Sequence, residues 1–285
     1  MPKWTAADVP PMAGRTIVIT GAGSGLGLIA ARELARAGAR VIVAARNEDK
    51  ARRAIKELPG MLEVRWLDVS DMTSVRAFAA GWDGPLDVLV NNAGVMDIPA
   101  QRTADGFDLQ TATNYLGPFV LTNLLLGHIT DRVVSVTSQL HRRARLDLAD
   151  IDWRSRKYNA MRAYSESKLE IVLFSLELQR RLEASGSPVR SVLAHPGIAT
   201  TALAAHSPAG RINSLKFLLN DPERGALPTL FAASQDVPGD AYVGPDGPGS
   251  IRGYPTIRKP GRAGLDAIAA RQLWDATARL TGVGA

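Results

Sequence analysis

Residues 20–27 of the chain read TGAGSGLG, a glycine-rich stretch that follows a short apolar run (15–20, RTIVIT) and precedes a segment with helical spacing of apolar residues. Between a strand and a helix, glycines permit a tight turn and let backbone N–H groups approach a pyrophosphate at the positive helix N-terminus. The spacing is T-G-x-x-x-G-x-G, with Gly21, Gly25 and Gly27 at its fixed positions. It predicts a dinucleotide-binding turn, and a purely structural glycine turn is the alternative.

Strand-like and helix-like segments alternate along the rest of the chain. The β-branched runs are short and almost continuously apolar, which is typical of strands covered on both faces. They comprise residues 15–20, 40–45, 62–67, 86–90, 132–137 and 189–194. This succession predicts an α/β fold with a single Rossmann-type, doubly wound parallel sheet of about seven strands and helices on both faces. No linker or change in composition divides residues 1–285, so we expect one domain.

The composition is that of a soluble globular protein, since 46% of the residues are hydrophobic, 22% are charged and none is cysteine. Disulfides, thiolate nucleophiles and cysteine-based metal sites are therefore excluded. The N-terminal residues lack the apolar region of a signal peptide, and no stretch approaches the roughly 20 apolar residues of a membrane-spanning helix. The formal charge of +6 is spread along the chain without a basic, aromatic-rich run. We expect a cytoplasmic protein with no membrane span and no nucleic-acid partner.

The residue at the end of the second predicted strand indicates which dinucleotide is bound. An acidic residue at this point would hold the ribose 2′-hydroxyl of NAD. The strand instead ends Ala44-Ala45-Arg46, and an arginine can form charge-assisted hydrogen bonds with a 2′-phosphate. We therefore expect NADP(H) to be favoured over NAD(H), the alternative being a solvated arginine at the start of a loop.

The stretch RAYSESK (162–168) places Tyr164 four residues before Lys168. On a helix these two side chains lie on one face, and a nearby ammonium charge lowers the pKa of a phenol. Taken alone, the pair is better explained by a tyrosine at the edge of the core and a solvated lysine. Beside a dinucleotide-binding turn, it predicts a general acid or base that handles the proton accompanying hydride transfer.

These motifs, with several others in the same order, resemble the short-chain dehydrogenase/reductase superfamily over about residues 13–200. The phrases NNAGVM, TADGFDLQTATNYLGPFVLTNLLL and AYSESKLE are most similar to its retinol-dehydrogenase and WW-domain-oxidoreductase-like group. The motifs are TGAGSGLG, Leu67-Asp68-Val69, Asn91-Asn92-Ala93-Gly94, Asn114-Tyr115-Leu116-Gly117, Ser138, Tyr164-x-x-x-Lys168 and Pro196-Gly197.

The resemblance implies a role for each of four catalytic residues. Tyr164 is the general acid or base, and Lys168 lowers its pKa and bonds the nicotinamide ribose. Ser138 holds the substrate oxygen; it is preferred to the neighbouring Thr137. Asn114 holds a helix kink and an ordered water, which link Lys168 to solvent as a proton relay.

The resemblance also implies a cofactor-binding set that takes in the glycine turn, the arginine and the later motifs. Within it, Asp68 contacts the adenine amino group and Asn91 orders the backbone. The set is Gly21, Ser24, Gly25, Leu26, Gly27, Arg46, Asp68, Val69, Asn91, Ala93, Gly94, Tyr164, Lys168, Pro196, Gly197 and Thr201.

The interval of 26 residues between Ser138 and Tyr164 is longer than the common one in the family, and a similar insertion is implied for the retinol-dehydrogenase-like group. Its residues 139–160 are polar and irregular. His141 lies in it, but no acidic partner or oxyanion motif supports a hydrolase triad with Ser138. The other histidines lack metal-ligand spacing, so we expect no metal site.

The remaining segments bear on substrate and assembly. Residues 199–222 are apolar enough to cover a lipophilic aldehyde, ketone or alcohol, although they fit helix-core positions as well. The family implies a homodimer through helices at about 108–129 and 161–184, unless the final helix, about 265–280, covers that surface. The rival function is a non-catalytic NADP-binding regulator or redox sensor on the same fold.

Overall fold

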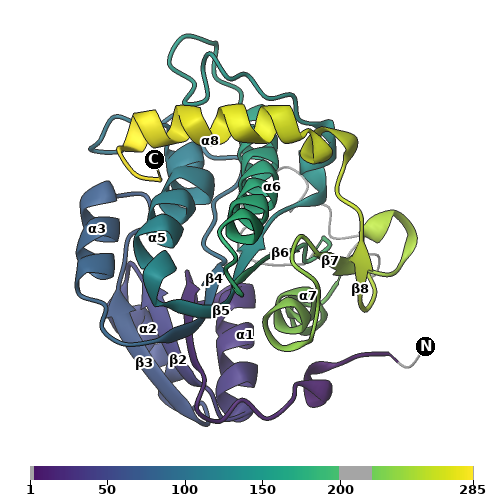
Figure 1. Cartoon of the computed structure of the whole chain (residues 1–285). Helices are drawn as coiled ribbons and strands as arrows, with labels where there is room; N and C mark the ends of the chain where they lie inside the picture. The colour runs from purple at the N-terminus through teal and green to yellow at the C-terminus, as the bar shows by residue number, and fades with distance from the viewer. Residues whose placement is uncertain (1–2, 199–219, 285) are drawn as a thin grey trace.

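The computed structural model describes residues 3–198 and 220–284, which form an eight-stranded sheet in the order β3-β2-β1-β4-β5-β6-β7-β8 (Figure 1). All neighbouring strands pair in parallel except β7 and β8, which are antiparallel. The strands are β1 (Thr16–Thr20), β2 (Arg40–Ala45), β3 (Met61–Trp66), β4 (Leu86–Asn91), β5 (Ile129–Val136), β6 (Arg190–Ala194), β7 (Tyr242–Pro245) and β8 (Pro255–Arg258). The doubly wound α/β fold is confirmed, but about seven strands were expected, and the six runs named from the sequence correspond to β1–β6, without β7 and β8.

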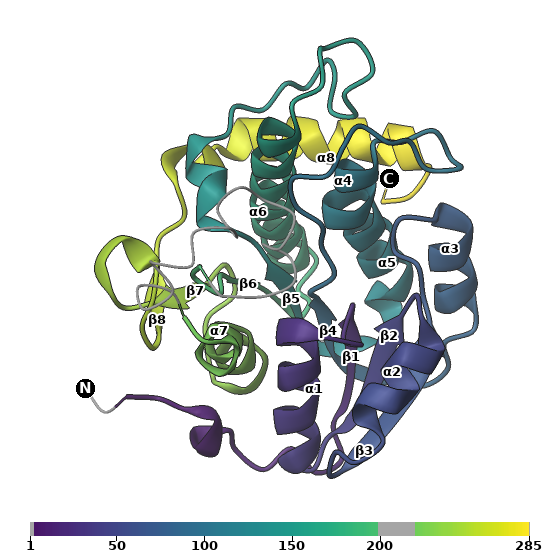
Figure 2. The same ribbon diagram turned by 180° about the vertical axis from the view of Figure 1, so that it is seen from behind.

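Helices cover both faces of the sheet, so the strands are buried on both sides. Val18 and Ile42 point into one core with α3, α5, α6 and α8, whereas their neighbours Ile17 and Val41 point into the other with α1, α2 and α7 (Figures 1 and 2). The helices are α1 (Gly25–Arg36), α2 (Glu48–Ile55), α3 (Met72–Ala80), α4 (Leu109–Thr111), α5 (Gly117–Leu125), α6 (Ala160–Ala184), α7 (Pro222–Ser234) and α8 (Ala267–Thr281). In the described ranges, no helix has both the length and the apolar character required to cross a membrane.

The last helix, α8, lies across α5 and α6, as both views show (Figures 1 and 2). Trp274 of α8 stacks on Phe174 of α6 with ring centroids 5.7 Å apart, and it meets Phe119 of α5 edge-on at 4.9 Å. The hydroxyls of Tyr115 and Thr277 are 2.6 Å apart. The helix therefore packs on α5 and α6, the helices through which the family implies a homodimer.

Trp274→Ala is expected to lower the free energy of unfolding by about 3–5 kcal/mol, because it removes a large side chain that is buried against two helices. Gln272→Ala, at an exposed position of the same helix, is the control and should change stability by less than about 0.5 kcal/mol. Urea unfolding of the two variants measures the difference. Equal midpoints for both variants would show that α8 is not packed as described.

The insertion before α6 begins with a 3-10 turn (Gln139–Arg143) and continues irregularly, as its polar sequence predicts. Its loop is held by carboxylates: Asp150 accepts backbone hydrogen bonds from Arg154, Ser155 and Arg156, and this lowers the pKa of Asp150 to about 2. Asp152 accepts from the backbone N–H of Asp108 at 2.6 Å. The insertion is thereby fixed to the start of α4.

Candidate active site

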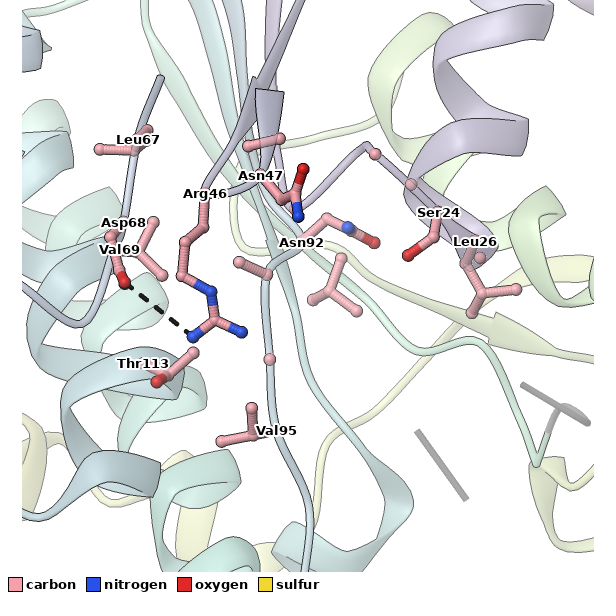
Figure 3. A pocket seen from close by; sticks show the side chains of 18 of the residues that line it. Ser24, Leu26, Arg46, Asn47, Leu67, Asp68, Val69, Asn92, Val95 and Thr113 are labelled. Carbon is pink, nitrogen blue, oxygen red and sulfur yellow. Dashed lines mark ion pairs between the residues drawn. The ribbon is translucent and has the colours of Figure 1, made fainter. Parts of the chain in front are cut away.

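The glycine turn opens onto a cavity of about 370 Å³ at the carboxyl ends of the strands, a size suited to a small ligand (Figure 3). Gly25 has φ +60°, in the left-handed region that favours glycine, and no atom lies within 4 Å of where its Cβ would be. At Gly27 a Cβ would lie 2.4 Å from Nδ2 of Asn92, so the helix can approach β4 only through glycine. The turn thus forms an open cradle of backbone against the N-terminus of α1, which fits a dinucleotide pyrophosphate.

Most of the predicted cofactor-binding residues line this cavity. They are Gly21, Ser24, Gly25, Leu26, Gly27, Arg46, Asp68, Val69, Ala93, Gly94, Tyr164, Lys168 and Pro196. Asn91 does not line it; its buried amide donates to Oγ1 of Thr122 at 3.0 Å and so orders the end of β4. Gly197 is also absent from the lining and forms a turn with φ +74°. Thr201 and most of the expected covering segment, 199–222, lie outside the described residues.

Sequence reasoning missed several residues of the lining. Asn47 caps α2 by accepting from the backbone N–H of Lys50, and both residues line the cavity together with Arg46. The signal that could have found Lys50 is a second cation in the first turn of the helix that follows the second strand. The other missed side chains are Ala45, Leu67, Asn92, Val95, Leu109, Thr113, Val136 and Thr137.

Arg46 extends across the mouth of the cavity towards Asp68 (Figure 3). Its Nη1 is 3.9 Å from Oδ2 of Asp68, and its side chain is 73% exposed. Asp68 is held by Ser70, whose backbone N–H and hydroxyl both donate to Oδ1. An exposed ion pair of this length contributes little, so the guanidinium can turn to another anion at low cost.

Tyr164, near the start of α6, is only 4% exposed and hydrogen-bonds to the side chain of Ser138. Burial raises the pKa of Tyr164 to about 12, although the bond to Ser138 acts to lower it. The alternative hydroxyl, Thr137, instead donates to the carbonyl of Lys168 at 2.8 Å. Ser138 is therefore the hydroxyl beside the phenol.

Lys168 does not lower the pKa of Tyr164 here, contrary to the prediction from the sequence. Its ammonium donates to the carbonyl of Val136 at 3.0 Å and lies 5.9 Å from the centre of the Tyr164 ring. Burial lowers the pKa of Lys168 to about 8. Desolvation of the phenol thus outweighs a charge that is turned towards a backbone oxygen.

Asn114 lies at the centre of a π-helical turn (Ala112–Leu116) between α4 and α5, a local widening that is frequent at functional sites. Its side chain accepts from the N–H of Val95 and donates to the carbonyl of Val95, each at 2.9 Å. It also donates to Oγ of Ser167. The amide therefore ties the kink to the loop after β4 and to α6, close to Lys168.

The histidines in the described part of the chain have structural partners. His141 and His195 are buried, and His128 contacts the carbonyl of Gly84. Burial lowers the pKa of His195 to about 4. The described residues contain no cluster of side chains that could hold a metal ion.

Comparison with known proteins points to one family. The model of the short chain dehydrogenase family matches residues 15–149 of the chain. Human retinol dehydrogenase 13 is 36% identical, covering 95% of this chain and 85% of its own. Mouse polyprenol dehydrogenase is also 36% identical, and the alignment covers 97% of this chain and 86% of the mouse protein.

Two solved structures extend the likeness to three dimensions. A crystal structure of an uncharacterized protein from Mycobacterium paratuberculosis is 48% identical, with a TM-score of 0.89 over 99% of this chain and 98% of the other. A Beutenbergia cavernae protein, provisionally described as an NAD(P) dependent gluconate 5-dehydrogenase and holding NADP, is 28% identical, with a TM-score of 0.60 over 78% and 90%. The chain therefore belongs to the short-chain dehydrogenase/reductase superfamily, within its retinol-dehydrogenase-like group.

Proposed function

We propose that the protein is an NADP-dependent oxidoreductase that interconverts a lipophilic aldehyde or ketone and its alcohol. The observation that carries the proposal is the buried phenol of Tyr164, bonded to Ser138, in the same cavity as the glycine cradle. The curated relatives named for retinol and polyprenol, both lipophilic alcohols, support the substrate class. Val95 and Leu109 give the cavity apolar walls.

A bound nicotinamide supplies the hydride in reduction and accepts it in oxidation. Tyr164 supplies the proton: with a pKa of about 12 it is a neutral phenol at neutral pH, which suits donation to a carbonyl oxygen. Ser138 holds that oxygen beside the phenol. Lys168 holds the nicotinamide ribose, and Asn114 holds the water through which the proton is replaced. The site therefore suits reduction of a carbonyl, because the phenol of Tyr164 already carries the proton that the reaction needs.

The preference for NADP rests on two cations. Arg46 has only a weak ion pair to give up, and Lys50 lines the same cavity. A 2′-phosphate would receive charge-assisted hydrogen bonds from both, whereas a 2′-hydroxyl carries no charge to attract them.

The affinity for NADPH is expected to weaken as the pH rises above about 8, by at most about tenfold per pH unit, because the lowered pKa of Lys168 makes its ribose-binding ammonium neutral there. Titration of NADPH binding between about pH 7 and about pH 9.5 measures this change. Lys168→Met is the control. Its affinity for NADPH should be lower than that of the wild type at neutral pH and should not fall further as the pH rises. A wild-type affinity that stays constant across this range would contradict the role of Lys168.

Consumption of NADPH with a panel of lipophilic aldehydes and ketones tests the proposed reaction. Turnover with any of them supports the oxidoreductase. Tight NADPH binding without turnover across the panel favours the rival, a non-catalytic NADP-binding regulator. Two features favour this rival: the raised pKa of Tyr164, and the bond of the Lys168 ammonium to the Val136 carbonyl.

A further inference from the structure

His141 is fully buried three residues after Ser138, in the 3-10 turn that follows β5. Its Nδ1 lies 2.6 Å from the carbonyl oxygen of Ser138, and its Nε2 lies 2.8 Å from the backbone nitrogen of Gly261. A backbone N–H can only donate, so Nε2 accepts and carries no proton. The proton is therefore on Nδ1, which donates to Ser138. Burial lowers the pKa of His141, so the neutral ring that both bonds require is favoured.

Two more bonds join the same turn to the C-terminal part of the chain. Gln139 donates to the carbonyl of Gly249 at 2.8 Å, and Arg142 donates to the carbonyl of Lys259. A Cβ on Gly261 would lie 2.9 Å from Cγ of Arg142 and 3.3 Å from Nε2 of His141, so the two segments are in close contact. The ring of Tyr242 from β7 packs on the imidazole, with centroids 5.6 Å apart.

The backbone carbonyl of Ser138 thus receives both the N–H and the Nδ1–H of His141. Ser138 in turn bonds the phenol of Tyr164 through its side chain. A continuous series of contacts leads from Gly261 through His141 and Ser138 to Tyr164. Gly261 donates to His141 and His141 donates to the Ser138 carbonyl, so the turn that carries Ser138 is held by a residue more than 100 positions later in the chain.

We propose that His141 is a positioning residue: it fixes the rotation of Ser138 towards Tyr164 by holding the turn after β5 against the C-terminal segment at Gly261. This rests on the proposed function, in which Ser138 holds the substrate oxygen. His141 is not among the residues that line the cavity. His141 acts on the orientation of the serine hydroxyl. A displacement of about 1 Å at a reacting centre can lower the rate on the order of 100-fold, so loss of this orientation should have a large effect.

The test uses three replacements that separate the two bonds. His141→Asn retains a donor for the Ser138 carbonyl, His141→Gln retains an acceptor for Gly261, and His141→Phe retains only the packing on Tyr242. We expect kcat to fall by roughly 100-fold in His141→Phe, with partial recovery in His141→Asn and an unchanged dissociation constant for NADPH.

A second readout separates positioning from stability. The bond from Ser138 lowers the pKa of Tyr164, so the kinetic pKa of alcohol oxidation should rise in His141→Phe towards its value in Ser138→Ala. Trp274→Ala is the matched control, destabilised by a site outside the active centre. His141→Phe with the stability loss of Trp274→Ala but with wild-type kcat and pH profile would overturn the proposal.

A third readout does not need turnover. The amides of Leu140 and Gly261 are bonded to the Ser138 hydroxyl and to His141 respectively. Both should exchange hydrogen faster in His141→Phe than in the wild type. If the wild type consumes no NADPH, the proposed function fails and this exchange decides the inference alone. Faster exchange at Gly261 with no change at Leu140 would show that the contact does not reach Ser138, and the positioning role would be wrong.

Discussion

Tyr164→Phe is expected to lower kcat for carbonyl reduction by roughly 10²–10⁴-fold, the range typical for loss of a general acid. Phenylalanine retains the ring, which is buried in α6, and removes only the hydroxyl that bonds Ser138. The dissociation constant for NADPH should change little, because the glycine cradle and the cations at Arg46 and Lys50 are untouched. The loss therefore falls on kcat and kcat/KM equally, as for a group that acts in the transition state.

Tyr115→Phe is the matched control for this experiment. Tyr115 is also fully buried, and its hydroxyl also makes one hydrogen bond, to Thr277 of α8. Its removal should cost about 1 kcal/mol in stability and leave kcat unchanged. A Tyr164→Phe enzyme that keeps a turnover close to that of Tyr115→Phe would show that another group delivers the proton.

The second large effect is expected at Arg46. Replacing Arg46 with alanine should weaken NADPH binding by roughly 10- to 100-fold, since a hydrogen bond to a charged group contributes about 1.5–3 kcal/mol. NADH binding should stay the same, because it has no 2′-phosphate. The ratio of kcat/KM for NADPH to that for NADH measures the change, and it should fall further when Lys50→Ala is added.

Arg53→Ala is the control for Arg46, because Arg53 is an exposed cation on α2 outside the cavity lining. It should leave the cofactor ratio unchanged. A wild-type preference for NADH, or an equal loss of both cofactors in Arg46→Ala, would contradict the assignment of Arg46 to the 2′-phosphate.

The local parts of the fold could be predicted from the sequence. The apolar runs of β1 to β6 and the glycine turn depend on neighbouring residues, and the structure has them within a few positions of the prediction. The strands β7 and β8 were not identified, because each is a four-residue strand with a proline, in or beside a Gly- and Pro-rich stretch, and has no long apolar run to reveal it. The pairing of β8 with β7 is a tertiary contact.

Within the site, the sequence predicted which side chains lie together but not their pKa values. The spacing of Tyr164 and Lys168 places them on one face, yet the pKa of each depends on burial by the rest of the fold. The amphipathic pattern predicted α8, whereas its position over α5 and α6 depends on how Trp274 fits between Phe119 and Phe174. Such contacts between distant segments are not visible in a single sequence.

The most direct measurement follows deuterium from NADPH labelled at the nicotinamide C4 into the product of a lipophilic aldehyde, with Tyr164→Phe in parallel. If the protein is the proposed oxidoreductase, mass spectrometry will find one deuterium on the carbinol carbon of the alcohol formed by the wild type, and almost none with the variant. Tight binding of NADPH with no labelled alcohol from any aldehyde or ketone in the panel would contradict catalysis and leave the NADP-binding regulator as the function.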